Sequence, residues 1–164
     1  MNHRIGQGID FHRLEKGLKL WLGGILINSG KGSVAHSDGD VLLHAICDSL
    51  LGAAGLPDIG VHFPDSDPRY KGIRSTLLLE RVYNIIRKKG YKVSNIDCTV
   101  CLEKPKIASY IPEMQSVIAG ILETDTDSIS IKATTAEKLG FIGREEGIMA
   151  LAVCGLEKHP PGGC

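Results

Sequence analysis

The sequence lacks an excess of charge of either sign. Its 19 Lys and Arg residues balance 19 Asp and Glu residues among 164, so the formal net charge is zero. No global field therefore recruits nucleic acid or an anionic membrane, and any phosphate binding must be local. The chain also lacks an apolar run of transmembrane length, and its first residues do not resemble a signal peptide. We expect a cytoplasmic protein with neither nucleic acid nor membrane as a partner.

Cysteine is too scarce and too irregular for a disulfide framework. The five cysteines cannot all pair within one chain. Cys98 and Cys101 form a C-x-x-C, but positions three apart in a strand face opposite sides, and no second C-x-x-C supports a zinc knuckle. We expect reduced thiols that are mostly buried.

The chain also lacks internal repeats and linkers, which favours a single domain over residues 1–158, followed by a disordered Pro- and Gly-rich tail at 159–164. Residue patterns predict strands at 5–11, 19–22, 24–27, 93–103, 128–134 and 147–158, with loops at 29–34 and 56–74. They predict helices at 37–55, 75–89 and 107–122, with at least a helical turn at 135–139. This order predicts an α/β (α+β) fold, a mixed β-sheet with helices packed on one face.

One strand and the first helix carry a possible metal site. Asp10 and His12 are one residue apart in a strand, so their side chains project to the same side. The helix, for which Ser37 is the expected cap, adds His44 as a third ligand from its polar face. Two imidazoles and a carboxylate leave one position of a tetrahedral zinc ion open, as in catalytic sites. Asp48, one turn further on, could orient the His44 imidazole. Alternatively, His12 is a surface residue and His44 a hydrogen-bonded helix residue.

Two further segments have both a structural and a functional interpretation. Asp58, Asp65 and Asp67 could accept hydrogen bonds from a polyol near the Gly60 amide, or simply form a solvated loop. Thr134-x-x-Glu137 fits a capping box, yet a strand-to-helix junction also presents free N–H groups to an anion. Glu137 could instead coordinate Mg²⁺.

Two further segments are candidate binding sites for a phosphate or a nucleobase. Arg144 suits a phosphate or an ion pair. Pro105-Lys106 fits either an ordinary helix start or a nucleobase pocket built from loop backbone.

Several motifs appear in register along the chain. They are G-Q-G-I-D-F-H (6–12), A-H-S-D-G-D-V-L-L-H (35–44), D-I-G (58–60), H-F-P-D (62–65), K-A-T-T (132–135) and E-K-L-G-F-I-G-R (137–144). Together they resemble the 2-C-methyl-D-erythritol 2,4-cyclodiphosphate synthase family of the non-mevalonate (MEP) isoprenoid pathway, from Arg4 to about Leu156. The resemblance implies a phosphorus–oxygen lyase. Such an enzyme converts 4-diphosphocytidyl-2-C-methyl-D-erythritol 2-phosphate into the cyclic diphosphate and CMP, by attack of the substrate's 2-phosphate on the β-phosphorus. The lack of a recognisable transit peptide favours a bacterial cytoplasm, or a plastid stroma if a transit peptide has been trimmed.

The resemblance also implies roles for individual residues. Zn²⁺, or another divalent metal, would be held by Asp10, His12 and His44, and Mg²⁺ or Mn²⁺ bridging the diphosphate would be held by Glu137. His36 and Thr135 would stabilise the transition state, and Ser37 would hold phosphate. The erythritol part would contact Asp58, Ile59, Gly60, Phe63, Pro64, Asp65, Ser66 and Asp67. The cytidine would be recognised, largely through backbone groups, by Leu102, Glu103, Lys104, Pro105, Lys106, Ile107, Ala108, Thr134, Thr135, Ala136 and Glu137.

The resemblance further implies a homotrimer with active sites between subunits. Phe141 and Arg144 would line an axial cavity able to hold an isoprenoid diphosphate. Glu103, Lys104 and Ala136 differ from the family's side chains, which backbone recognition would tolerate. Two other functions stay open: a zinc-dependent phosphohydrolase with Asp48 or Asp58 as its base, and a non-catalytic trimer that binds nucleotide or isoprenoid diphosphate.

Overall fold

The computed structural model describes residues 3–158, and the predicted tail at 159–164 lies outside the described residues. A five-stranded sheet has the order β4-β1-β7-β5-β6, in which only β5 and β6 pair in parallel. Its strands are β1 (His3–Lys16), β4 (Lys31–Val34), β5 (Tyr91–Cys101), β6 (Ile129–Thr134) and β7 (Gly147–Lys158). A separate hairpin pairs β2 (Leu20–Leu22) with β3 (Ile25–Ile27).

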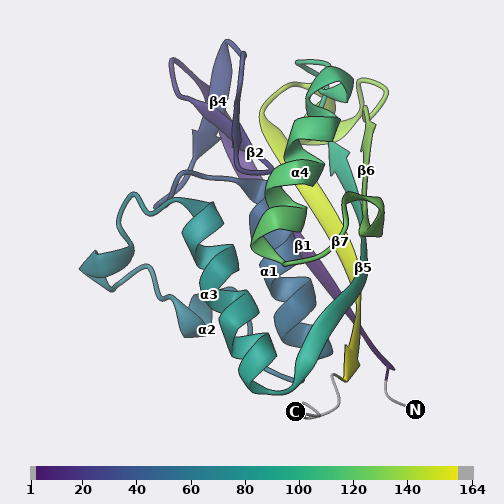
Figure 1. Ribbon diagram of the computed structural model, residues 1–164. Coiled ribbons are helices and arrows are strands. Elements are labelled where there is room, and N and C mark those ends of the chain that lie inside the picture. Colours follow the sequence, from purple (N-terminus) through teal and green to yellow (C-terminus); the bar gives the residue numbers. More distant parts are fainter. Residues whose placement is uncertain (1–2, 159–164) are drawn as a thin grey trace.

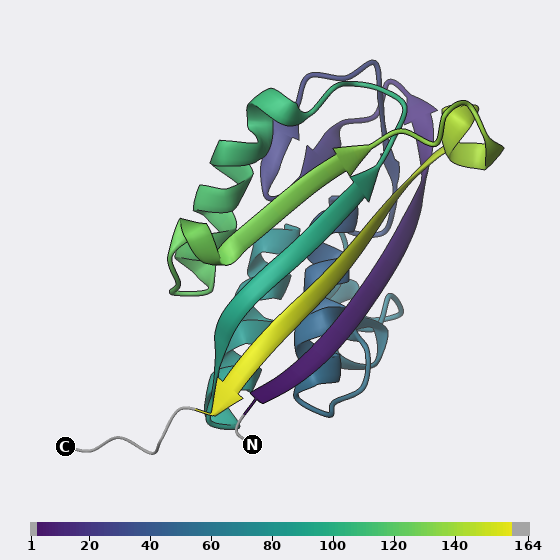
Figure 2. The same ribbon diagram turned by 90° about the vertical axis from the view of Figure 1, so that its right-hand side faces the viewer.

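Three longer helices, α1 (Val41–Ala53), α3 (Ser75–Lys88) and α4 (Ile111–Ile121), lie on one face of the sheet, and no helix of residues 3–158 covers its other, bare face (Figures 1 and 2). The shorter helical segments are α2 (Ile59–His62), α5 (Gly140–Gly143), η1 (Pro68–Tyr70), η2 (Ala108–Tyr110) and η3 (Thr126–Ser128). The predicted mixed sheet with helices on one face is confirmed. No helix among residues 3–158 is both long enough and apolar enough to cross a bilayer.

Close packing of α1 against β1 depends on two glycines. A Cβ atom at Gly8 would lie 2.0 Å from the backbone oxygen of Ala45, and one at Gly6 would lie 2.0 Å from that of Ser49. Only glycine allows this approach of strand to helix. Because side chains alternate along a strand, Asp10 and His12 continue the face that carries these glycines. The packing therefore brings both residues up to α1.

The bare face of the sheet is apolar along β1 and β7. Ile5, Ile9, Phe11 and Val153 are exposed there, Ile5 to 79%. The Phe11 ring also lies 6.1 Å, centroid to centroid, from the ring of Phe141 in α5. Exposed apolar side chains that gather on one face of a sheet are typical of an interaction surface.

The structure corrects several predicted boundaries. Part of the predicted loop 29–34 is strand β4, paired with β1, and the predicted loop 56–74 contains α2 and η1. Helix α1 begins at Val41 with Asp40 as its cap, so Ser37 does not cap it. The prediction of a helical turn at 135–139 is wrong. Glu137 and Lys138 have positive φ angles of 49° and 67° and form a non-helical turn. The Thr134 hydroxyl bonds the backbone oxygen of Thr135 rather than capping a helix.

The cysteines of residues 3–158 are free, as predicted. Cys47, Cys98 and Cys154 are buried, whereas Cys101 is half-buried. Burial raises the pKa of Cys98 to about 12, so this thiol stays protonated at neutral pH.

Candidate active site

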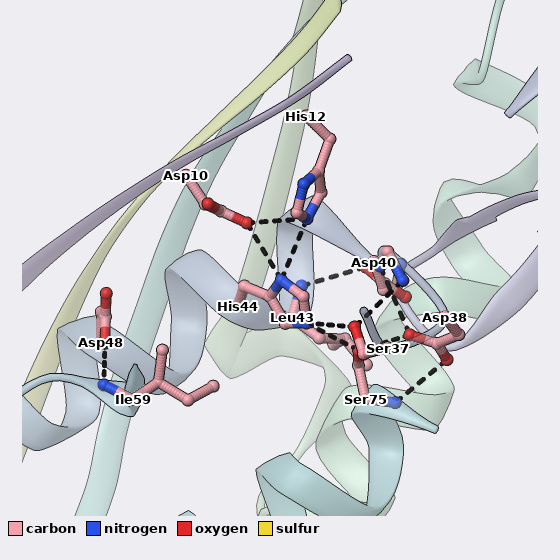
Figure 3. Close-up of polar contacts among 12 residues, drawn as sticks. Asp10, His12, Ser37, Asp38, Asp40, Leu43, His44, Asp48, Ile59 and Ser75 are labelled. Carbon is pink, nitrogen blue, oxygen red and sulfur yellow. Dashed lines mark hydrogen bonds and ion pairs between the residues drawn. The ribbon is translucent and has the colours of Figure 1, made fainter. Parts of the chain in front are cut away.

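Asp10 and His12 of β1 meet His44 of α1 at one point (Figure 3). Asp10 Oδ2 lies 3.1 Å from His12 Nε2 and 3.0 Å from His44 Nδ1, and the two nitrogens are 3.1 Å apart. Ligands bound to zinc at about 2.0–2.1 Å in a tetrahedron are separated by roughly 3.3 Å. The triangle therefore fits a small divalent cation, and its carboxylate and imidazole donors suit zinc.

The three groups are also coupled through their charges. Burial opposes the charge of Asp10, but hydrogen bonds from His12 and His44 outweigh it and lower the pKa of this carboxyl group. Burial likewise disfavours the charged form of His44, yet the contact with Asp10 raises the pKa of its imidazole. The carboxylate of Asp10 and the imidazole of His44 therefore each favour the charged form of the other.

Asp40 fixes where α1 begins, one turn before His44. Its carboxylate is fully buried and accepts hydrogen bonds from the N–H groups of Gly23 (3.0 Å), Gly24 (2.7 Å) and Leu43 (3.0 Å). Burial raises the pKa of Asp40, while the hydrogen bonds from Gly24 and Leu43 act in the opposite direction. The backbone N–H of His44 also donates to the Asp40 carbonyl (3.0 Å), so the cap sets the height of the imidazole along the sheet.

The expected role of Asp48 is wrong. Asp48 Oδ1 accepts a hydrogen bond from the backbone N–H of Ile59 at 2.7 Å (Figure 3). The imidazole of His44 instead has Asp10 on one nitrogen and the hydroxyls of Ser75 and Ser37 on the other. Asp48 lies one helical turn from His44 on the same face of α1, but its carboxylate is hydrogen-bonded to the backbone of α2 instead of the imidazole. Asp48 therefore anchors the loop that follows α1.

A cavity of about 380 Å³ opens at the metal candidates. Its wall contains His36 and Ser37, predicted to act on phosphate, and four residues of the predicted erythritol loop, namely Ile59, Gly60, Phe63 and Asp65. Other members of that loop have local partners. Asp58 caps α2 through the N–H groups of Gly60 (2.9 Å) and Val61 (3.2 Å), and Asp67 caps η1 and pairs with Arg69. Pro64 and Ser66 are exposed and are not part of the wall.

The predicted cytidine segments meet at a second cavity of about 210 Å³. It is lined by Leu102, Glu103, Pro105, Lys106, Ile107, Ala108, Ala133, Thr134 and Thr135, and the Lys104–Pro105 peptide bond is cis. The side chain of Glu103 is only 3% exposed. Its Oε1 accepts hydrogen bonds from the N–H groups of Ala136 (3.0 Å) and Lys138 (3.2 Å). Glu103 thus ties the two segments together.

Glu137 and Thr135 lie on an exposed turn away from the metal candidates. The Thr135 hydroxyl donates to Glu137 Oε1 at 2.7 Å. The cavity beside this turn shares no lining residue with the cavity at Asp10, His12 and His44. Within one chain, the structure therefore keeps the two predicted halves of the active site separate. Arg144 is exposed and pairs with Glu146 at 3.0 Å.

Sequence reasoning missed several residues of the site. Val34, Ala35, Tyr70, Ile73 and Leu78 line the first cavity, and Ser75 contacts His44. Apolar lining residues follow the same patterns as core residues, so no sequence signal separates them. Ser75 begins a helix, which is an ordinary place for serine.

Comparisons with known proteins identify the family of this chain. The model of the YgbB family matches residues 3–157. A relative from Porphyromonas gingivalis, named 2-C-methyl-D-erythritol 2,4-cyclodiphosphate synthase, is 57% identical over 92% of this chain and 93% of its own.

Solved structures give the same result. A Plasmodium falciparum structure, described as IspF in a CDP complex, matches 98% of this chain and 99% of its own with a TM-score of 0.85 and 36% identity. The bifunctional IspDF from Campylobacter jejuni matches 95% of this chain with a TM-score of 0.92 and 44% identity, and this chain spans only 42% of that longer protein. The chain therefore belongs to the YgbB family and is a member of the 2-C-methyl-D-erythritol 2,4-cyclodiphosphate synthases.

Proposed function

We propose that this chain converts 4-diphosphocytidyl-2-C-methyl-D-erythritol 2-phosphate into 2-C-methyl-D-erythritol 2,4-cyclodiphosphate and CMP. The observation that carries the proposal is the convergence of Asp10, His12 and His44 at the mouth of a cavity that also contains His36 and Ser37. The names of the family members support the same reaction.

The reaction needs positioning and charge neutralisation more than a protein nucleophile. The substrate's own 2-phosphate attacks the β-phosphorus and CMP leaves, so nucleophile and electrophile belong to one molecule. Zinc held by Asp10, His12 and His44 would supply Lewis-acid polarisation of a phosphate oxygen. Ser37 and His36, on the cavity wall, would hold the phosphate and stabilise the charge that develops during transfer.

The diphosphate side of the reaction would use the exposed turn. There the hydroxyl of Thr135 donates a hydrogen bond to one oxygen of Glu137, and this carboxylate would hold a second cation. We assign that cation as Mg²⁺ or Mn²⁺, because hard divalent ions prefer carboxylate and phosphate oxygens. The cavity at Leu102–Ala108 would take the cytidine, largely through backbone groups.

A homotrimer would join the two halves. Each half has its own cavity in one chain, so a substrate that used both would be held between two subunits of the assembly. The apolar face formed by Ile5, Ile9, Phe11 and Val153 offers the surface that such an assembly buries. Phe141, whose ring is tilted against that of Phe11, and Arg144 would then lie near the shared axis, where an apolar wall and a guanidinium suit an isoprenoid diphosphate.

The hydrolase alternative loses support from the structure. It requires a general base beside a metal-bound water, and Asp48 and Asp58 were the candidates. Neither lines the cavity, and both carboxylates accept hydrogen bonds from backbone N–H groups of α2.

Phosphorus NMR with zinc, Mg²⁺ and the substrate tests the proposal. We expect a cyclic diphosphate signal with equimolar CMP, lost in His44→Ala and kept in Gly52→Ala. Gly52 is an exposed position of the same helix, where a Cβ atom would meet nothing closer than 3.8 Å, so it is a matched control. CMP with only a linear phosphate would establish a hydrolase instead, and unchanged substrate would leave a binding protein.

A further inference from the structure

The Nε2 nitrogen of His44 faces the hydroxyl of Ser75, which in turn contacts Asp38, and neither residue has a role in the proposed reaction. His44 Nδ1 points to Asp10, and Nε2 lies 2.9 Å from the hydroxyl of Ser75 (Figure 3). Ser75 is the first residue of α3 and is fully buried. A buried hydroxyl against an imidazole nitrogen acts on the distribution of protons in the ring.

Asp38 determines which way the Ser75 hydroxyl points. Ser75 Oγ donates to Asp38 Oδ1 at 2.5 Å, and the backbone N–H of Ser75 donates to Oδ2 at 3.0 Å. The guanidinium of Arg74 also donates to Oδ2 (3.1 Å), while it stacks 3.6 Å from the centre of the Trp21 ring. An ionised carboxylate only accepts hydrogen bonds. The single hydroxyl hydrogen of Ser75 is therefore committed to Asp38, and its lone pairs face His44.

A lone pair facing Nε2 requires a hydrogen on that nitrogen. In a neutral imidazole the proton then sits on Nε2, and the lone pair of Nδ1 is free. Nδ1 is the atom that completes the triangle with Asp10 and His12. Ser37 is less suited to this task, because it lies 3.2 Å from Nε2 and already accepts the N–H of Gly39.

We propose that Ser75 and Asp38 are positioning residues for the metal site. They hold the proton of His44 on Nε2 and fix the ring so that Nδ1 faces the cation. The inference rests on the proposed metal site and adds residues to it. Histidines that bind metals usually donate their other N–H to a carboxylate or a carbonyl group. Here a serine hydroxyl links the imidazole to the carboxylate.

The zinc dissociation constant of the full-length protein, measured by competition with a chelator, tests the proposal. We expect Ser75→Ala to bind zinc about 10- to 100-fold more weakly than the original chain. Ser75→Thr keeps the hydroxyl and should restore the affinity. Ser49→Ala is the matched control, because Ser49 is also fully buried but donates to the backbone oxygen of Ile46.

A spectroscopic readout separates positioning from general destabilisation. In the zinc-loaded protein, NMR should show a slowly exchanging Nε2–H signal of His44, assigned by its absence in His44→Ala. The signal should be lost in Ser75→Ala and kept in Ser49→Ala. If Ser75→Ala does not fold, Asp38→Asn replaces it, because its amide can donate to Ser75 and release the hydroxyl hydrogen.

The outcomes distinguish this inference from the proposed function. Unchanged zinc affinity and an unchanged Nε2–H signal in a folded Ser75→Ala would overturn the positioning role. Weaker zinc binding in Ser75→Ala, together with no cyclic product from the original chain, would support the positioning role and refute the synthase. An original chain that binds zinc no better than His44→Ala would overturn both.

Discussion

The two halves of the proposed active site are built in opposite ways. The metal half rests on the longest strand and the most buried helix, β1 and α1, and its three ligand atoms are already within 3.1 Å of one another. The nucleotide half rests on two connecting segments, 102–108 and 134–138, and its Glu137 is exposed. One half is therefore preorganised by packed elements of the chain, whereas the other is built on exposed connecting segments.

The difference shows how rigidity is distributed with respect to chemistry. Metal ligands must be placed to within fractions of an ångström, which packed strands and helices achieve. The nucleotide half instead uses a turn with two consecutive positive φ angles, at Glu137 and Lys138, held by the carboxylate of Glu103. An exposed turn of this kind can adjust more readily than packed strands and helices when a ligand binds.

Substitution of Gly8 by Ala should have the largest effect, because it acts on the packing beneath the metal half. The new Cβ atom would lie 2.0 Å from the backbone oxygen of Ala45 and 2.7 Å from the backbone nitrogen of Ser49, which are not flexible side-chain ends. We expect a loss of at least about 3 kcal/mol in the free energy of unfolding. Urea denaturation measures it. Zinc affinity of the folded fraction should also fall, since β1 and α1 must separate.

Gly30→Ala is the control for this prediction. A Cβ atom at Gly30 would meet nothing within 4 Å, and its φ angle is not positive. Its stability should equal that of the original chain. Equal stability of Gly8→Ala would show that the close contact of β1 with α1 is not what assembles the metal half.

Substitution of Glu137 by Gln tests the independence of the two halves. The loss of the carboxylate should reduce turnover by about 10²-fold, because one charged clamp on the diphosphate is removed. Zinc content, measured by metal analysis of the purified protein, should not change, since the two cavities share no residue. Glu123→Gln is the matched control, another exposed glutamate with a positive φ angle. Zinc loss in Glu137→Gln would mean that the halves are not separate.

The metal half could be predicted in part from the sequence, because its ligands lie on regular elements. The D-x-H step and the helix pattern around His44 follow from the periods of strands and helices, so both ligand segments could be recognised from spacing. The contact between the two ligand segments depends on the close packing at Gly6 and Gly8. The alternation of side chains along a strand does not predict that packing. The partner of Asp48 could not be predicted either. Spacing shows which residues share a face, but not which backbone group from a later loop reaches them.

The nucleotide half was harder to predict for a different reason. Thr134 and Glu137 match a capping box in residue type and spacing, yet the chain turns with positive φ angles instead of entering a helix. The competing influence is Glu103, distant in sequence, whose carboxylate binds the N–H groups that a helix start would have presented. Only the resemblance to a known family connected these segments to the metal residues.

Substitution of Glu103 by Gln should have a smaller effect, confined to the nucleotide half. The amide keeps one acceptor oxygen but loses the charge that favours two N–H donors and Lys138. We expect the KM for substrate to rise roughly tenfold with kcat less affected, because the turn is less well positioned. Steady-state kinetics measure this. Glu113→Gln, at an exposed position of α4, should behave like the original chain. A fall in kcat alone would assign Glu103 to the chemical step.

The smallest expected effect is a pH dependence of stability that belongs to the metal half alone. Against the effect of burial, contact with Asp10 raises the pKa of His44 in the folded chain. Its stabilisation is therefore fully present below the unfolded value of about 6.5 and is lost as pH rises through the folded value.

The lowered pKa of Asp10 affects stability in a different pH range. Burial opposes its charge, but the two imidazoles lower its pKa, so the stabilisation from Asp10 is lost only in acid. The Tm of the zinc-free protein should then fall by a few degrees at most as pH rises from 6 to 8. Asp10→Asn should flatten this dependence, whereas Glu137→Gln should not. With zinc bound, the dependence should reverse, because a metal needs His44 without a proton on Nδ1. A zinc-free Tm that rises over this range would mean that the Asp10–His44 pair does not contribute to stability in solution.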